Sequence, residues 1–164
     1  MKTRLHQTRN DLPETIRRPI IDLLNQQLAD VRDLGLQAKQ AHWNVKGPNF
    51  IGLHELFDKV ADEVEEFTDD IAERAVELGG IALGTLQIMS KVSRLSAYPV
   101  DATSGQDHVA SLSAALAQFA HTTRGAINLS DEAGDAVTAD LLTGVSRGVD
   151  KLLWMVEAHG YAED

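Results

Sequence analysis

The chain has no cysteine among its 164 residues. Disulfide bonds, thiolate metal sites and thiol nucleophiles are therefore excluded as sources of stability or chemistry. The absence also leaves no thiol that peroxide could oxidise.

Aromatic residues are scarce as well, at 5 % of the chain, whereas Ala, Leu, Asp and Glu are plentiful. This balance favours helices over strands. With 43 % hydrophobic residues, a chain of this length can bury one core. We therefore expect a single all-α domain.

Long apolar runs are missing too. No run near the N-terminus could serve as a signal segment, and no later run approaches the length of a membrane span. We expect a soluble protein of the cytoplasm with no membrane partner, and association with the nucleoid stays open.

Positively charged residues are fewer than negatively charged ones: the chain has 15 Lys and Arg and 25 Asp and Glu, which gives a formal net charge of −10. Duplex binding depends on neutralising phosphates, so DNA is not a favoured partner, although a local basic patch could still bind it. We expect residues 1–18 to form a flexible, solvated N-terminal tail and residues 19–164 to form the folded domain. The tail carries five cations: Lys2, Arg4, Arg9, Arg17 and Arg18.

Four long helices and one short helix are expected from the apolar spacing. Pro19 suits a first helical turn, residues 46–49 break the chain, and Gly79 with Gly80 forms a stop signal. The long helices should cover residues 19–44, 50–78, 105–129 and 135–159, with the short one inside residues 85–95. This order predicts a ferritin-like four-helix bundle whose long crossover, between the second and third long helices, carries the short helix.

The usual core metal motif of such bundles, Glu-x-x-His, does not occur here. Along residues 50–78, the apolar stripe and the ionisable residues instead fall on two different faces of the helix. The second face holds His54, Asp58, Glu65, Asp69 and Glu73. If these residues bind metal, they do so on the outside of the subunit. Asp70 and Arg74 are expected to form an ordinary ion pair one turn apart.

Hairpin geometry adds His42 to this face. His42 and His54 each lie six positions from Pro48, so two antiparallel helices joined there should make them neighbours. Asp58 follows His54 by one turn on the same face. These three side chains can form a compact cluster of ligands.

Asp69 and Glu73 lie too far along the same helix to join that cluster, because eleven residues separate Asp58 from Asp69, roughly 16 Å along the axis. An antiparallel copy, related by a two-fold axis between Glu63 and Val64, would bring Asp69 and Glu73 of one chain beside His54 and Asp58 of the other. Each dimer would then hold two identical sites.

Iron suits these ligands, because imidazole and carboxylate groups accept Fe(II) and hard carboxylates stabilise Fe(III). Zinc and manganese fit the same donors, so both metals stay open. The ordinary alternative is a structural histidine and a solvated acidic face.

Two segments closely resemble the Dps family of mini-ferritins, named for DNA binding in starved bacteria. They are KQAHWNVKGPNFIGLHELFD (residues 39–58) and DDIAERAVELGG (residues 69–80), and the likeness continues through ALGT, YP and LLWMVEAHG. The resemblance implies a hollow dodecamer with ferroxidase sites at two-fold interfaces. Its ligands would be His42, His54 and Asp58 of one subunit with Asp69 and Glu73 of the partner. It further implies that paired Fe(II) reduces hydrogen peroxide, and that ferric mineral is stored in the cavity, which limits oxidative damage.

The resemblance assigns further roles at four positions. Trp43 and Trp154 match tryptophans that absorb stray oxidising equivalents, although each could equally fill an interface. Asp131 and Asp140 match aspartates that line iron-entry pores, whereas Ala136 stands where some members have another aspartate. Helix capping is the alternative role for Asp131 and Asp135.

Three functions compete on this evidence. The first is a peroxide-consuming ferroxidase and iron store built on the five ligands. The second is a non-enzymatic DNA-protecting protein of the nucleoid that acts through its basic N-terminal tail. A third is a shell that sequesters zinc or manganese with the same ligands.

Overall fold

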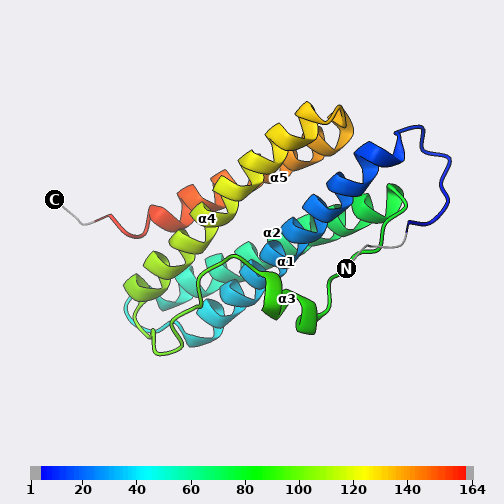
Figure 1. Cartoon of the computed structure of the whole chain (residues 1–164). Helices are drawn as coiled ribbons and strands as arrows, with labels where there is room; N and C mark the ends of the chain where they lie inside the picture. The colour runs from blue at the N-terminus through cyan, green and yellow to red at the C-terminus, as the bar shows by residue number, and fades with distance from the viewer. Residues whose placement is uncertain (1–4, 162–164) are drawn as a thin grey trace.

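The structure is a computed structural model that describes residues 5–161. Four long helices run side by side as two hairpins, with a short helix in the connection between them (Figure 1). Within the described residues there are no strands, only an isolated bridge between Lys46 and Ser104. The helices are α1 (Glu14–Asn44), α2 (Phe50–Glu77), α3 (Leu86–Val92), α4 (Gly105–Glu132) and α5 (Ala136–Glu157). The predicted all-α, ferritin-like bundle with a helix-bearing crossover is confirmed.

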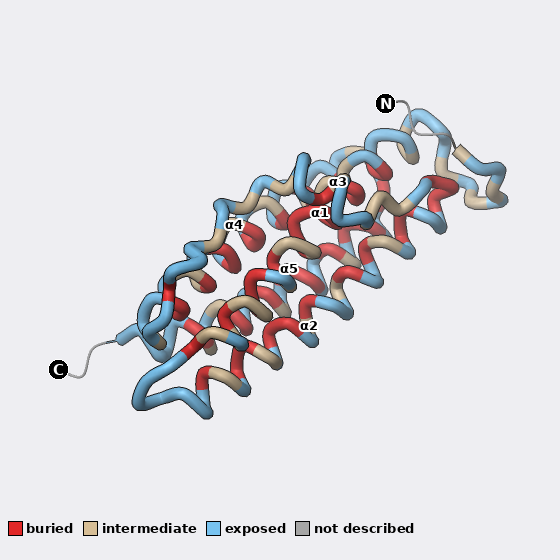
Figure 2. The backbone as a smooth tube through the Cα atoms, turned by 90° about the horizontal axis from the view of Figure 1, so that it is seen from below, coloured by how far each residue is buried: buried red, intermediate tan, exposed pale blue. Residues whose placement is uncertain are grey.

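The core lies between the hairpins, along one stripe of each long helix. Figure 2 shows that the buried residues lie on the inner side of the helices and the exposed residues on the outer side. The largest fully buried side chains include Leu24 of α1, Phe57 of α2, Phe119 of α4 and Leu152 of α5, so every long helix contributes. Burial of such side chains stabilises the fold by about 1.5–3 kcal/mol each.

Glycines end α2 and α4 in the same way. Gly79 and Gly134 both have φ of +85°, a left-handed conformation that costs glycine little. The amide of Gly79 donates to the Val76 carbonyl and that of Gly80 to the Ala75 carbonyl, which together make a Schellman motif. The predicted stop at Gly79–Gly80 is confirmed.

The first helix begins at Glu14, so the predicted start of this helix at Pro19 was wrong. The carbonyl of Pro13 accepts from the amides of both Ile16 and Arg17, which starts the helix earlier. Pro19 lies inside the helix, where it removes one backbone donor without ending it.

The chain before α1 contacts the far end of α2. The His6 amide donates to the Gly79 carbonyl at 2.7 Å. The Arg17 guanidinium donates to the carbonyls of Leu12 and Leu78, at 2.9 and 2.7 Å. Arg17, expected in a free tail, therefore ties this segment to the bundle. Lys2 and Arg4 lie outside the described residues.

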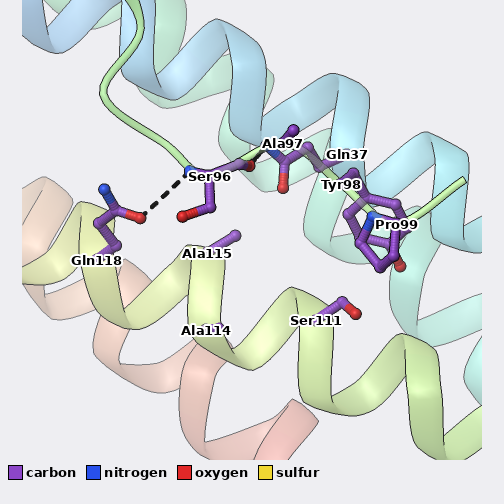
Figure 3. A pocket seen from close by; sticks show the side chains of 9 residues that line it. All are labelled: Gln37, Ser96, Ala97, Tyr98, Pro99, Ser111, Ala114, Ala115 and Gln118. Atoms are coloured by element: carbon purple, nitrogen blue, oxygen red, sulfur yellow. Dashed lines mark hydrogen bonds between the residues drawn. The ribbon is translucent and has the colours of Figure 1, made fainter.

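The crossover is pinned to α1 by a buried carboxylate. Asp30 of α1 is fully buried and accepts from the Arg94 guanidinium at 2.5 and 2.8 Å and from the Arg94 amide at 2.8 Å. Beyond Arg94 the crossover runs along α4, and a pocket of about 200 Å³ remains between them (Figure 3). Its lining includes Tyr98 and the small side chains of Ser96 and Ala115.

Among the described helices, none combines the length and the apolar character that crossing a membrane would require.

Candidate metal centre

His42 and His54 face each other where α1 ends and α2 begins. Nδ1 of His42 lies 2.7 Å from the His54 carbonyl oxygen, and Nδ1 of His54 lies 2.8 Å from the His42 carbonyl oxygen. The rings stack with centroids 3.7 Å apart. A carbonyl oxygen only accepts, so each Nδ1 carries a proton and donates it to the backbone of the other histidine. These reciprocal hydrogen bonds fix the orientation of both imidazole rings.

Asp58, the third residue of the predicted cluster, lies next to His42. Its Oδ1 lies 3.8 Å from Nε2 of His42. The Lys39 ammonium hydrogen-bonds to Asp58, and this bond is the main cause that holds the pKa of the Asp58 carboxyl below its usual value. His42 and His54 lower the pKa further, while desolvation opposes them. Asp58 is therefore ionised at neutral pH, and its carboxylate already forms an ion pair with Lys39.

Lys39 was absent from the predicted site. The count from Pro48 that pairs His42 with His54 also places Lys39 nine residues before the tip and Asp58 ten after it. The spacing therefore predicts this contact, although lysine is not a metal ligand. A metal ion that bound Asp58 would have to displace the Lys39 ammonium.

Asp69 and Glu73 are exposed on α2, and the structure does not bring them to the histidines. α2 is continuous from Phe50 to Glu77, so Asp69 lies roughly 16 Å along the axis from Asp58. Over residues 5–161, no group of three or more His, Asp or Glu side chains within the chain is arranged to hold a metal ion. The chain presents two separated parts of a possible site on one surface.

Large apolar side chains surround the histidines at the surface. Trp43 is 68 % exposed beside His42, and Phe50 and Ile51 are exposed at the start of α2. The Phe50 ring contacts that of His54 with centroids 5.1 Å apart. Trp154 is also exposed, near the end of α5. That end of α5 lies at the same end of the bundle as the connection between α1 and α2 (Figure 1). Such a patch favours contact with another protein surface.

The connection between α4 and α5 lies at the opposite end of the bundle from the connection between α1 and α2 (Figure 1). Asp131 is in the last turn of α4 and Asp140 is in the second turn of α5, and both are exposed. Asp135, between them, is buried and accepts from the Thr138 amide as the N-cap of α5. Helix capping is therefore confirmed for Asp135 alone, and Ala136 is the first residue of α5.

Arg74 is paired with Asp135, so the predicted pair with Asp70 was wrong. The guanidinium donates to Asp135 at 2.9 Å, to Thr138 Oγ1 at 2.9 Å and to Glu77 at 3.0 Å. Arg74 and Asp135 are separated by 61 residues, so helical spacing alone gave no sign of this contact.

Comparison with known proteins agrees with this architecture. The chain matches the ferritin-like domain family over residues 21–160. It is 50 % identical over 159 residues to the DNA protection during starvation protein of Agrobacterium fabrum, and the match covers 97 % of each chain. The structure resembles DpsC from Streptomyces coelicolor with a TM-score of 0.93 at 30 % identity, over 98 % of this chain and 94 % of that one. It resembles Dps from Microbacterium arborescens in the high iron form with a TM-score of 0.84 at 30 % identity, over 90 % and 95 % of the two chains.

Proposed function

This chain belongs to the Dps family of ferritin-like proteins, and from that premise we propose that it is a ferroxidase and iron store. It binds Fe(II) at sites shared between subunits, oxidises it preferentially with hydrogen peroxide and keeps the ferric mineral in a hollow shell. Two Fe(II) ions lose one electron each, and one peroxide molecule takes both electrons with two protons to form two molecules of water.

The observation that carries this proposal is the reciprocal pair of histidines. His42 and His54 each use Nδ1 on the other's backbone, so neither Nε2 atom is taken up by this exchange, and that of His42 lies 3.8 Å from the Asp58 carboxylate. Imidazole and carboxylate groups are a donor set that Fe(II) accepts. A solved relative in a high iron form supports iron as the substrate.

A second subunit supplies the remaining ligands in this proposal. His42, His54 and Asp58 form one half-site, and Asp69 and Glu73 on the same face of α2 form the other half-site for the partner. A two-fold axis between Glu63 and Val64 closes both sites at once. The exposed apolar residues around His54 support burial against a second copy.

The direct test mixes anaerobic Fe(II) with stoichiometric peroxide and follows ferric absorbance. Fast oxidation and a soluble ferric core are expected, and a rate equal to that of the protein-free solution would refute the proposal. Molecular oxygen in place of peroxide tests the oxidant preference. Metal analysis of the purified protein separates an iron store from a zinc or manganese shell.

The shared site can be tested by complementation. A His54→Ala/Asp58→Ala chain and an Asp69→Ala/Glu73→Ala chain should each be inactive alone. Co-expressed with different tags, they create mixed interfaces where one of the two sites takes both intact halves. Activity should return in the doubly tagged fraction. Continued inactivity of verified mixed shells would exclude the shared site.

The assembled shell is a dodecamer in this proposal, which native mass spectrometry tests directly. Asp131 and Asp140 line its iron-entry pore, so Asp131→Asn/Asp140→Asn should slow iron uptake into the shell. Initial oxidation should stay unchanged at low iron. An unaltered uptake rate in the double variant would remove these residues from the entry route. Trp43 and Trp154 are the proposed accessory aromatic residues of the centre.

DNA protection is the second candidate, favoured by the name of the 50 % identical relative. Two of the five cations have partners within the chain and are therefore weaker candidates for phosphate contacts. Arg17 binds backbone carbonyls, and Arg18 pairs with Glu14 at 2.5 Å. Lys2, Arg4 and Arg9 remain as candidates. Replacing all three with Gln leaves α1 intact and should abolish a gel shift if the tail binds DNA. Unchanged binding, or none from the start, counts against this function.

A further inference from the structure

Tyr98 and His108 form a hydrogen-bonded pair away from the proposed metal centre. Tyr98 lies in the crossover before α4, and His108 lies in the first turn of α4. The Tyr98 hydroxyl is 2.7 Å from Nδ1 of His108, and the rings are nearly parallel, at 15°. His108 is 1 % exposed and Tyr98 is partly buried. The pair therefore has little access to water.

Both members of the pair are neutral. Burial raises the pKa of the Tyr98 phenol, so the phenol keeps its proton. Burial also lowers the pKa of the His108 imidazole, against smaller opposing effects of the Asn44 backbone and Asp107. The phenol therefore donates to Nδ1, and the imidazole proton is on Nε2.

The Nε2 atom of His108 is the unusual feature of this pair. It is buried and makes no hydrogen bond of ordinary geometry within residues 5–161. The Asn44 backbone interacts with the imidazole only weakly, because its effect on the pKa is smaller than that of burial. A buried polar atom that is poorly paired is costly, so the histidine keeps a base next to the tyrosine at some cost to stability.

Ring contacts connect the pair to α2, one residue before Asp58. Phe57 of α2 directly precedes Asp58 and is fully buried. The Phe57 and His108 rings meet edge to face, with centroids 6.3 Å apart. The Tyr98 and His108 ring centroids are 6.0 Å apart. The pair therefore contacts the residue that is next to Asp58 in the chain.

We infer that Tyr98 and His108 act as a buried one-electron donor to strong oxidants of the hydroxyl-radical class, formed when peroxide meets a single Fe(II) at the centre. This inference rests on the proposed function. The Tyr98 O–H bond breaks, the electron passes to the hydroxyl radical to give hydroxide, and the proton passes to Nδ1 of His108. A further Fe(II) ion then reduces the tyrosyl radical and becomes Fe(III), while His108 returns the proton. The pair is restored. The net result is that the hydroxyl radical oxidises one Fe(II) ion and does not damage another molecule.

The composition of the chain makes this inference testable, because there are only two tyrosines, Tyr98 and Tyr161. Tyr161 is 77 % exposed. Tyr98→Phe removes only a hydroxyl, and Tyr161→Phe is the matched control. Peroxide is added to protein loaded with less than one Fe(II) per centre, samples are frozen within milliseconds, and tyrosyl radicals are measured by electron paramagnetic resonance.

Wild type and Tyr161→Phe should show a tyrosyl signal that Tyr98→Phe loses. His108→Gln should weaken it in protein that still folds, because the proton then has no base to accept it. A signal that survives in Tyr98→Phe, or that disappears in Tyr161→Phe, overturns the inference.

Iron oxidation measured on the same samples separates the two proposals. Normal iron oxidation with no Tyr98 signal overturns the electron donor and leaves the ferroxidase standing. Failure of iron oxidation with no signal overturns both.

Discussion

Two aspartates, Asp135 and Asp58, each face a cation in opposite surroundings. Arg74 and Asp135 are closed from water, with side chains 6 % and 1 % exposed. Lys39 and Asp58 are open, at 35 % and 41 %. Asp135 also accepts from the Thr138 amide and hydroxyl, so its carboxylate is fully used. Asp58 Oδ1 lies 3.8 Å from Nε2 of His42.

The difference separates a structural carboxylate from a functional one. A buried ion pair cannot be broken without stranding a charge in the interior, so it is held in one arrangement. An exposed pair contributes little to stability and exchanges partners readily. Asp135 therefore joins α2 to α5, whereas Asp58 is free to exchange its lysine for another cation, as the proposed function requires.

The closed pair should give the largest effect. Arg74→Met leaves Asp135 buried without its cation, so we expect a loss of about 3–5 kcal/mol in unfolding free energy. Arg124→Met is the matched control, because Arg124 pairs with Asp150 where both side chains are 52 % exposed. Chemical denaturation of both variants measures the difference, and equal losses would break the contrast between closed and open pairs.

Asp30 and Arg94 are an intermediate case, because Asp30 is fully buried while Arg94 is 40 % exposed. Arg94→Gln removes the guanidinium but keeps the backbone donor and a side-chain amide. Loss of charge-assisted hydrogen bonds predicts about 1.5–3 kcal/mol. Proteolysis within the crossover should also speed up. Resistance equal to wild type would show that Asp30 does not hold the crossover.

His108 sharpens the comparison because burial outweighs the nearby charge of Asp107 and lowers the pKa of its imidazole. Its pKa is lowered in the folded chain, so below pH 6.5 the unfolded chain takes up the proton first. Stability should therefore fall as the pH drops below that value, by at most about 1.4 kcal/mol per pH unit from this group. Denaturation series from pH 7.5 to about pH 5 should show a shallower slope for His108→Gln than for the exposed-site control His121→Gln. Identical slopes would contradict the assignment.

The open pair should give the smallest change in stability and the clearest change in binding. Lys39→Met frees Asp58, so anaerobic calorimetry should show tighter Fe(II) binding while the unfolding midpoint stays near that of wild type. Lys59→Met is the control, since Lys59 pairs with Glu63 one turn away. Weaker iron binding in Lys39→Met would mean that the lysine supports the site rather than competing for it.

Local pattern was enough to predict most of the fold. Helical spacing and the glycine stops predicted the four long helices, because apolar periodicity and left-handed glycines act over a few residues. Pro19 misled the first boundary, since proline suits an early turn but is also tolerated further inside a helix held by packing. Counting from Pro48 predicted the contact of His42 with His54.

The sequence by itself determined the helices, the hairpin register and the side chains that share the outer face of α2, because each depends on spacing along one or two neighbouring helices. Only the tertiary structure decided that Arg74 pairs with Asp135, that Arg94 binds Asp30 and that Tyr98 donates to His108. These partners come from different helices or from the crossover. Which polar groups meet there depends on the space and acceptors that packing leaves in the interior, where an unpaired group is costly.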